Sequence, residues 1–218
     1  CRSFGSYAKL SNHSRNCASD ASGSGIVIEN ADKKYILTNN HVIDPYRKVD
    51  VTLGSRKLKD VKVHAIDVLA DLAILGPIRE SKLPAALKMG DGKQVEQGDE
   101  LFLVGFPDEV QSDEDDDLSA TISKGIVSRI RTSKEFGQKY FQTDAAITGG
   151  QSGGGLFTGK GELVGVSGLS FNEDFALVLS GQNVRDSVTR MFKKPAIPKG
   201  LFSLPAGPDD KSAPSATS

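Results

Sequence analysis

The sequence predicts an all-β fold, and three observations support this. The 218 residues include 23 glycines. Short segments in which apolar and polar residues alternate recur along the chain, as in half-buried strands separated by turns. Helix signals are sparse. The length is enough for one such domain.

Elements can be assigned in order along the chain. The clearest helix signal is near the end, where Val184, Val188, Met191 and Phe192 follow i, i+4, i+7, i+8 spacing in a charged segment, which predicts one amphipathic terminal helix. The predicted strands lie at about 25–29, 34–38, 49–53, 60–66, 71–75, 100–105, 119–131, 139–143, 162–167 and 175–180.

Residues 149–156, Gly-Gly-Gln-Ser-Gly-Gly-Gly-Leu, place Ser152 among five glycines. A hydroxyl that attacks a carbonyl needs backbone N–H donors aimed at the oxyanion, and glycines allow the unusual dihedrals and close substrate approach that this requires. Ser152 is therefore the predicted nucleophile, with the amides of Gly150 and Ser152 as the oxyanion hole. The alternative is a flexible glycine turn between strands.

A histidine stands at the end of the apolar strand Tyr-Ile-Leu-Thr-Asn-Asn-His that runs to His41. An imidazole can accept a serine proton and return it to a leaving amine near neutral pH, so His41 is the predicted general base. The alternative is a histidine that merely ends a strand. His13 lies in a polar, serine-rich start, and His64 lies in an alternating segment typical of one strand face.

Three aspartates could orient the histidine. Asp71 opens the apolar run Leu-Ala-Ile-Leu, which would anchor its backbone at the margin of the core, where a carboxylate can accept the imidazole Nδ1–H. Asp67 competes for this role, and either acid could simply end a strand. Asp144 is a third candidate, but it is close to Ser152 in sequence. Asp71 is the predicted choice.

In these segments the chain resembles the trypsin-like serine proteases, and among them the HtrA (Deg) branch. The resemblance covers about residues 20–192, and the order His, Asp, Ser with long separations is that of this clan. The motifs that carry it are Ser-Gly-Ser-Gly-Ile-Val-Ile at 22–28, Leu-Thr-Asn-Asn-His-Val at 37–42, Asp-Leu-Ala-Ile-Leu at 71–75, Thr-Asp-Ala-Ala-Ile at 143–147, Gly-Gln-Ser-Gly-Gly-Gly-Leu at 150–156 and Gly-Glu-Leu-Val-Gly-Val at 161–166.

The resemblance implies two six-stranded antiparallel β-barrels with the triad in the cleft between them, followed by a short helix. It implies cofactor-free hydrolysis of unfolded or misfolded proteins, with no metal site, and an extracytoplasmic location that is periplasmic, secreted or lipid-anchored. It also raises the expectation of a homo-oligomer, in this family a trimer. Such proteases usually continue into PDZ domains, and none is visible in this sequence.

Two positions depart from the family pattern. Gln151 stands where secreted digestive relatives carry an aspartate that pairs with a new amino terminus, so that activation switch is expected to be absent. Gly155 stands where proline or alanine is usual, which loosens the segment after Ser152 without removing a donor.

Substrate preference follows from the family's specificity-pocket position, which falls on Ala146 with Ile147 beside it. Neither side chain offers a counter-charge to a buried cation, so cleavage after small or medium aliphatic residues is predicted over cleavage after Arg or Lys. Val166, Ser167 and Gly168 are expected to form the pocket wall.

Charge excludes some classes of partner. Lys and Arg number 27, Asp and Glu 28, and the net charge is −1, so no global field points to nucleic acid or an anionic membrane. Five acids crowd into 112–117, which indicates a solvated loop, a calcium-binding loop or a collar for basic substrate flanks. The sequence contains no run of 18 apolar residues, so no transmembrane helix is predicted.

The predicted organisation is an amino-terminal segment at 1–19, a protease domain at 20–193 and a Pro/Ala/Ser-rich tail or linker at 194–218. Cys1 and Cys17 lie in the first segment, and could form a disulfide or stay free, while Cys1 could instead carry a lipid. The predicted function is a serine endopeptidase. The alternative is a chaperone-like or resting-state peptide binder that needs a partner for activation.

Overall fold

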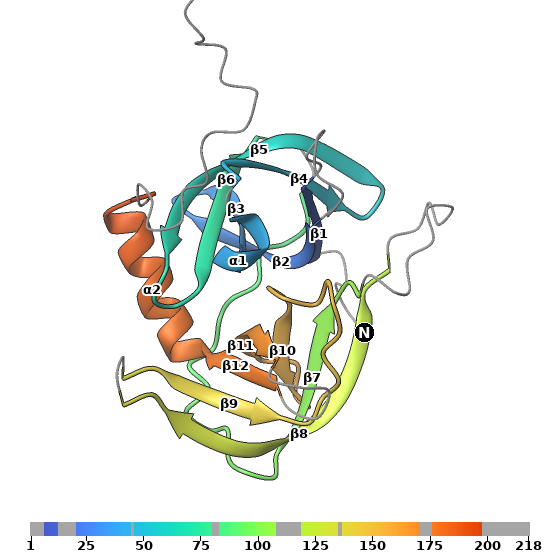
Figure 1. Cartoon of the computed structure of the whole chain (residues 1–218), viewed down its shortest axis with the longest axis vertical. Coiled ribbons are helices and arrows are strands. Elements are labelled where there is room, and N and C mark those ends of the chain that lie inside the picture. Colours follow the sequence, from blue (N-terminus) through green and yellow to red (C-terminus); the bar gives the residue numbers. More distant parts are fainter. Residues whose placement is uncertain are drawn as a thin grey trace, which may run out of the picture.

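The computed structural model describes residues 7–12, 21–44, 46–79, 83–107, 119–134, 137–170 and 176–197. Its strands form two closed six-stranded antiparallel barrels, and a terminal helix follows them. Figure 1 shows the first barrel in the upper half of the view, the second in the lower half, and the helix along one side. The predicted fold class is confirmed.

The first barrel has the strand order β1-β2-β3-β6-β5-β4, and a single helical turn, α1 (Asn40–Ile43), follows β3. Its strands are β1 (Tyr7–Asn12), β2 (Ala21–Asn30), β3 (Lys33–Asn39), β4 (Lys48–Leu53), β5 (Arg56–Asp67) and β6 (Leu72–Ile78).

The second barrel has the strand order β10-β11-β12-β9-β8-β7 and passes directly into the helix α2 (Gly181–Lys193). Its strands are β7 (Glu100–Gly105), β8 (Thr121–Thr132), β9 (Lys139–Thr143), β10 (Gly155–Thr158), β11 (Leu163–Ser170) and β12 (Ala176–Ser180).

Two strands were absent from the sequence prediction. Residues 1–19 were expected to precede the domain, whereas Tyr7–Asn12 form β1 and close the first barrel by pairing with β2 and β4. Leu10 is buried in that barrel, opposite Val51. The short β10 closes the second barrel between β7 and β11. Each segment has too few apolar residues for a local pattern, because burial comes from pairing with distant strands.

A shared core joins the barrels to α2. One cluster of buried residues combines Ile26 and Leu72 of the first barrel with Val166 of the second and Val184 and Met191 of the helix. Burying such a face stabilises the fold by roughly 25 cal/mol for each Å² of apolar surface removed from water. The predicted helix is confirmed, and its apolar stripe is what fixes it against both barrels.

Several sequence predictions concern residues outside the described ranges. These are Cys1, Cys17, His13, the acidic run at 112–117 and the chain beyond residue 197.

Candidate active site

His41 and Asp71 form a hydrogen-bonded pair at one end of the first barrel. Asn39, the last residue of β3, pairs with Leu72, the first of β6, so the residues just beyond these strand ends lie side by side. The Nδ1 of His41 is 2.6 Å from Oδ2 of Asp71, and the backbone N–H of His41 donates to Oδ1 at 2.9 Å. Both carboxylate oxygens thus contact the same residue.

The backbone of Asp71 is held in an unusual conformation. Its φ is +51°, in the left-handed region that aspartate tolerates better than most residues. Its carbonyl oxygen accepts hydrogen bonds from the Asn39 side-chain amide at 2.9 Å and from the Asn40 backbone N–H at 3.0 Å. Three successive residues, Asn39, Asn40 and His41, therefore donate four hydrogen bonds to one aspartate.

The two competing aspartates lie elsewhere. Asp67 accepts hydrogen bonds from Ser187 at 2.6 Å and Arg190 at 2.8 Å, both in α2. Burial alone would raise the pKa of Asp67, but these bonds and one from the Ala70 N–H more than offset it and lower the pKa. Asp144 accepts the backbone N–H of Ile126 at 2.7 Å. Neither contacts His41.

His64 belongs to a different environment. Its ring lies 5.3 Å from that of Tyr35 and 5.6 Å from that of Phe192, centroid to centroid, between the first barrel and α2. Burial lowers its pKa. The strand-face interpretation of the sequence is confirmed, since β5 includes this residue.

Ser152 lies in a tight turn, residues 149–154, between the barrels. Gly150 and Gly153 both have φ of +85°, which favours glycine. Among the described residues, the amide N–H groups of Gly150 and Ser152 have no hydrogen-bond acceptor. The Ser152 hydroxyl donates to the carbonyl of Gly168 at 3.5 Å.

Gln151 folds back within this turn. Its side chain is buried, and its Oε1 accepts the backbone N–H of Thr148 at 2.9 Å. Its own N–H donates to the Thr148 carbonyl at 3.2 Å. Both of these bonds join Gln151 to Thr148, the residue just before the turn, and neither involves an amino terminus.

Two buried serines, which the sequence analysis did not assign a structural role, support the turn from opposite barrels. Ser167 of β11 donates through Oγ to the Gln151 carbonyl at 2.7 Å. Ser24 of β2 donates through Oγ to the Gly150 carbonyl at 2.8 Å. The available signal was a small polar residue inside an apolar or glycine-rich strand, which indicates a buried hydrogen bond.

The predicted pocket residues differ in their exposure. Ala146 is exposed, and Ile147 packs against the core of the second barrel. Val166 and Ser167 are fully buried, so the side chains of these two wall candidates contribute to the core and to the turn. Gly168 is partly exposed beside Ser152. Residues 171–175, which follow in sequence, lie outside the described part of the chain.

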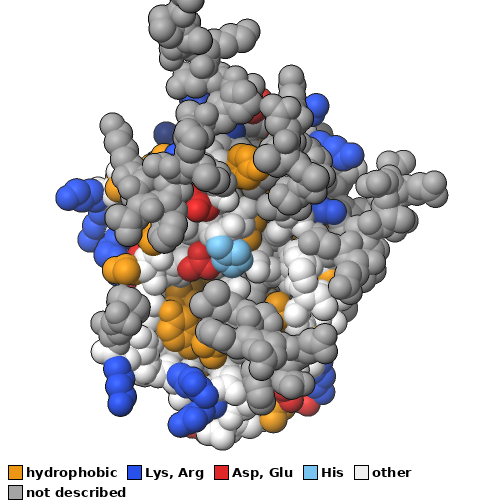
Figure 2. Space-filling model, viewed as in Figure 1, with side chains coloured by type: hydrophobic (Ala, Val, Ile, Leu, Met, Phe, Trp, Pro, Cys, Tyr) orange, Lys and Arg blue, Asp and Glu red, His pale blue; other side chains and the backbone are white. Residues whose placement is uncertain are grey.

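The His41–Asp71 pair is accessible. The side chain of His41 is 44% exposed and that of Asp71 28%. On the face drawn in Figure 2, a histidine and an acidic side chain touch near the middle of the surface, with hydrophobic side chains close by.

Residues of the second barrel contact the turn that carries Asp71. The Gln138 side chain donates to the Leu69 carbonyl at 3.1 Å, two residues before Asp71, and the Tyr140 hydroxyl donates to Gln138. Burial, and then the charge of Asp71, raise the pKa of Tyr140. Contacts across the barrels thus fix the turn that carries the aspartate.

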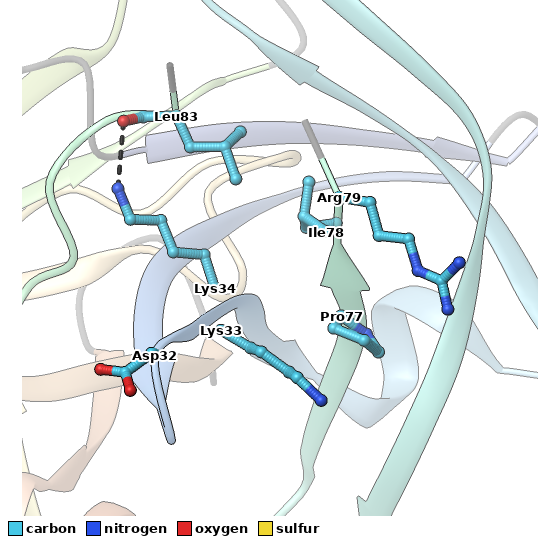
Figure 3. Close-up of a pocket in the computed structure, with 7 residues that line it drawn as sticks. All are labelled: Asp32, Lys33, Lys34, Pro77, Ile78, Arg79 and Leu83. Atoms are coloured by element: carbon cyan, nitrogen blue, oxygen red, sulfur yellow. Dashed lines mark hydrogen bonds between the residues drawn. The ribbon is translucent and has the colours of Figure 1, made fainter. Parts of the chain in front are cut away.

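A pocket of about 510 Å³ lies away from this site (Figure 3). It is lined by residues at the start of β3 and the end of β6, whereas His41 and Asp71 lie at the opposite ends of those strands. The ammonium of Lys34 points toward Leu83 and donates to its carbonyl at 3.1 Å (Figure 3). The pocket does not belong to the candidate site.

The described residues contain no group of three or more His, Cys, Asp or Glu side chains arranged to hold a metal ion. In the same residues, neither helix has the length and apolar character needed to span a bilayer.

Comparison with known proteins identifies relatives of this domain. Residues 23–166 match the model of the trypsin-like peptidase domain family. The periplasmic serine endoprotease DegP of Escherichia coli (strain K12) is 37% identical over 150 residues, which cover 67% of this chain and 30% of DegP. The serine protease Do-like HtrB of Bacillus subtilis (strain 168) is 32% identical over 158 residues, 69% of this chain and 33% of HtrB. The chain thus spans about a third of these relatives.

Solved structures agree with this assignment. The serine endoprotease from Yersinia pestis superposes with a TM-score of 0.70 at 27% identity, covering 87% of this chain and 64% of that one. The HtrA-type protease AlgW with tripeptide gives 0.72 at 26% identity, covering 88% and 62%. The chain therefore belongs to the trypsin-like peptidase domain family, and its relatives within that family are HtrA- and DegP-like serine proteases.

Proposed function

We propose that this chain is a serine endopeptidase domain in which His41, Asp71 and Ser152 form the catalytic triad. The observation that carries the proposal is the 2.6 Å hydrogen bond between Nδ1 of His41 and Asp71, because it leaves Nε2 as the nitrogen free to act as a base. Membership of a peptidase family supports the same activity.

In the proposed reaction, Oγ of Ser152 attacks the scissile carbonyl while Nε2 of His41 takes the hydroxyl proton. Asp71 holds Nδ1–H and stabilises the imidazolium. The amides of Gly150 and Ser152, free of other acceptors in the described chain, donate to the oxyanion. His41 then passes the proton to the leaving amine. Water, deprotonated by His41, hydrolyses the acyl-enzyme and restores Ser152.

The rival is a resting-state or chaperone-like peptide binder. The observation that favours it is the direction of the Ser152 hydroxyl, which donates to Gly168 at 3.5 Å. A catalytic hydrogen bond to histidine is often long or misaligned before substrate binds, so this geometry is also compatible with an active enzyme. Hydrolysis by the purified chain distinguishes the two.

We propose that the chain acts outside the cytoplasm, since the DegP relatives are named as periplasmic endoproteases. From the family resemblance we further propose that its substrates are unfolded or misfolded proteins and that it forms a homo-oligomer. We place the protease domain at 20–193 together with the barrel strand at 7–12. No cofactor enters this mechanism.

The specificity proposal depends on the two residues at the predicted pocket position. Ala146 and Ile147 carry no charge, and one carboxylate oxygen of the nearby Asp144 accepts a backbone N–H of β8. A lysine or arginine side chain would be buried without a partner, at high cost. Mass spectrometry of cleaved peptide libraries should show Val, Ala, Ile or Leu before the scissile bond. Predominant cleavage after Arg or Lys would refute this pocket assignment while leaving the triad intact.

The activity itself is tested with an unfolded protein such as reduced casein. We expect wild type to cleave it and Ser152→Ala to be slower by about 10⁴–10⁶-fold, with an unchanged melting temperature, because the hydroxyl of the partly buried Ser152 supplies chemistry rather than packing. Wild-type-like cleavage by Ser152→Ala would reject Ser152 as nucleophile. A wild type that binds casein without cutting it would support the rival.

A further inference from the structure

Ser24 lies in β2 of the first barrel and is fully buried, yet its hydrogen bonds reach the second barrel. Its hydroxyl donates to the Gly150 carbonyl at 2.8 Å and accepts the backbone N–H of Phe106 at 2.8 Å. Its own backbone N–H donates to the Ser152 carbonyl at 2.7 Å. One residue therefore contacts the 149–154 turn twice and the end of β7 once.

The contact with Gly150 bears on the oxyanion hole. Gly150 has φ of +85° and no side chain, so hydrogen bonds to its peptide groups are what hold its orientation. The carbonyl that Ser24 binds and the N–H proposed to bind the oxyanion flank the same Cα atom. Fixing the carbonyl thus restricts the direction of the N–H. In the described chain the Gly150 carbonyl has no other side-chain donor.

The backbone of Ser24 is itself anchored close to the turn. Its carbonyl oxygen accepts the Thr38 hydroxyl at 2.8 Å, and Thr38 belongs to the strand that leads to His41. A Cβ atom at Gly153 would come within 2.1 Å of the same carbonyl oxygen. The β2–β3 pair and the turn therefore meet without intervening space, and a shift of Ser24 would be transmitted to the turn.

We infer that Ser24 is a positioning residue for the proposed reaction: from the first barrel, its hydroxyl sets the orientation of Gly150 so that the amide of Gly150 meets the oxyanion. This inference rests on the proposed function. It differs from a purely structural role because it concerns the transition state, where the oxyanion forms, and not the binding of the ground-state peptide.

The test compares wild type, Ser24→Ala and the matched control Ser180→Ala. Ser180 is also fully buried and donates one hydroxyl hydrogen bond, to Asn183 at 2.9 Å, at the start of α2. We expect Ser24→Ala to lower kcat by about 10- to 100-fold with KM within about threefold, since misplacement near a reacting centre is costly. Ser180→Ala should lower the melting temperature while keeping kcat.

A peptide boronate with an aliphatic residue at boron provides a second readout, because its tetrahedral adduct with serine places an anionic oxygen in the oxyanion hole. Ser24→Ala should weaken inhibition by the boronate about as much as it lowers kcat, while a non-covalent product peptide binds as it does to wild type. Equal kcat and boronate affinity in Ser24→Ala and wild type would overturn the inference.

Two further results keep the conclusions separate. If Ser24→Ala does not fold, Ser24→Cys takes its place, because the thiol fills similar space but is only a weak hydrogen-bond donor. The same loss of kcat is expected for Ser24→Cys. An unchanged kcat in a folded Ser24→Cys would overturn the inference. If wild type neither cleaves casein nor binds the boronate, the proposed function fails, and the inference fails with it.

Discussion

At the residue scale, two aspartates four positions apart have different roles. Asp71 accepts two hydrogen bonds from His41, whereas Asp67 binds Ser187 and Arg190. The sequence favoured Asp71 because an apolar run follows it. It could not show that Asp67 has partners about 120 residues further along the chain, since α2 reaches it only in the folded molecule.

Asp71→Asn tests this division of roles. The asparagine oxygen can still accept the His41 backbone N–H, and asparagine tolerates the positive φ, so the fold should persist. Its NH₂ group would face Nδ1 and favour the tautomer protonated at Nε2, which cannot act as a base. We expect kcat to fall about 10⁴-fold in steady-state assays. Asp67→Asn is the control and should keep kcat; the reverse pattern would assign the orienting role to Asp67.

At the element scale, α2 is attached to the first barrel by an ionic contact as well as by its apolar face. The Asp67 side chain is 14% exposed, and it accepts hydrogen bonds from Ser187 and Arg190 one helical turn apart. The sequence predicted the helix from its apolar spacing. It did not predict this attachment, because charged residues on a polar helix face carry no signal of their partners.

The lowered pKa of Asp67 makes this attachment sensitive to acid. A carboxyl group whose folded pKa lies below its unfolded value of 3.8 adds stability that is complete well above 3.8. This stability is lost as pH falls below 3.8 and through the lower folded pKa. Urea unfolding should show Asp67→Asn less stable than wild type by about 1–2 kcal/mol between pH 6 and 7. The difference should shrink below about pH 4. A difference independent of pH would contradict the ionic role.

At the scale of the whole molecule, the candidate site exists only where two barrels meet. The sequence motifs predicted His41, Asp71 and Ser152 as the catalytic triad. The resemblance to a known family, which rests on the same motifs, implied the two-barrel fold. They did not predict that Ser24, Gln138 and β1 join or close the barrels. Such contacts join residues that are far apart in the sequence. The local sequence around them therefore carries almost no signal that they form.

The central claim is that Ser152 is a nucleophile activated by His41 and Asp71. A fluorophosphonate reacts covalently with an activated serine, and peptide mass spectrometry locates the adduct. We predict one adduct on wild type, at Ser152, and none on Ser152→Ala or on His41→Ala, both of which should remain folded by circular dichroism. An adduct on another serine, or equal labelling of wild type and His41→Ala, would contradict the account.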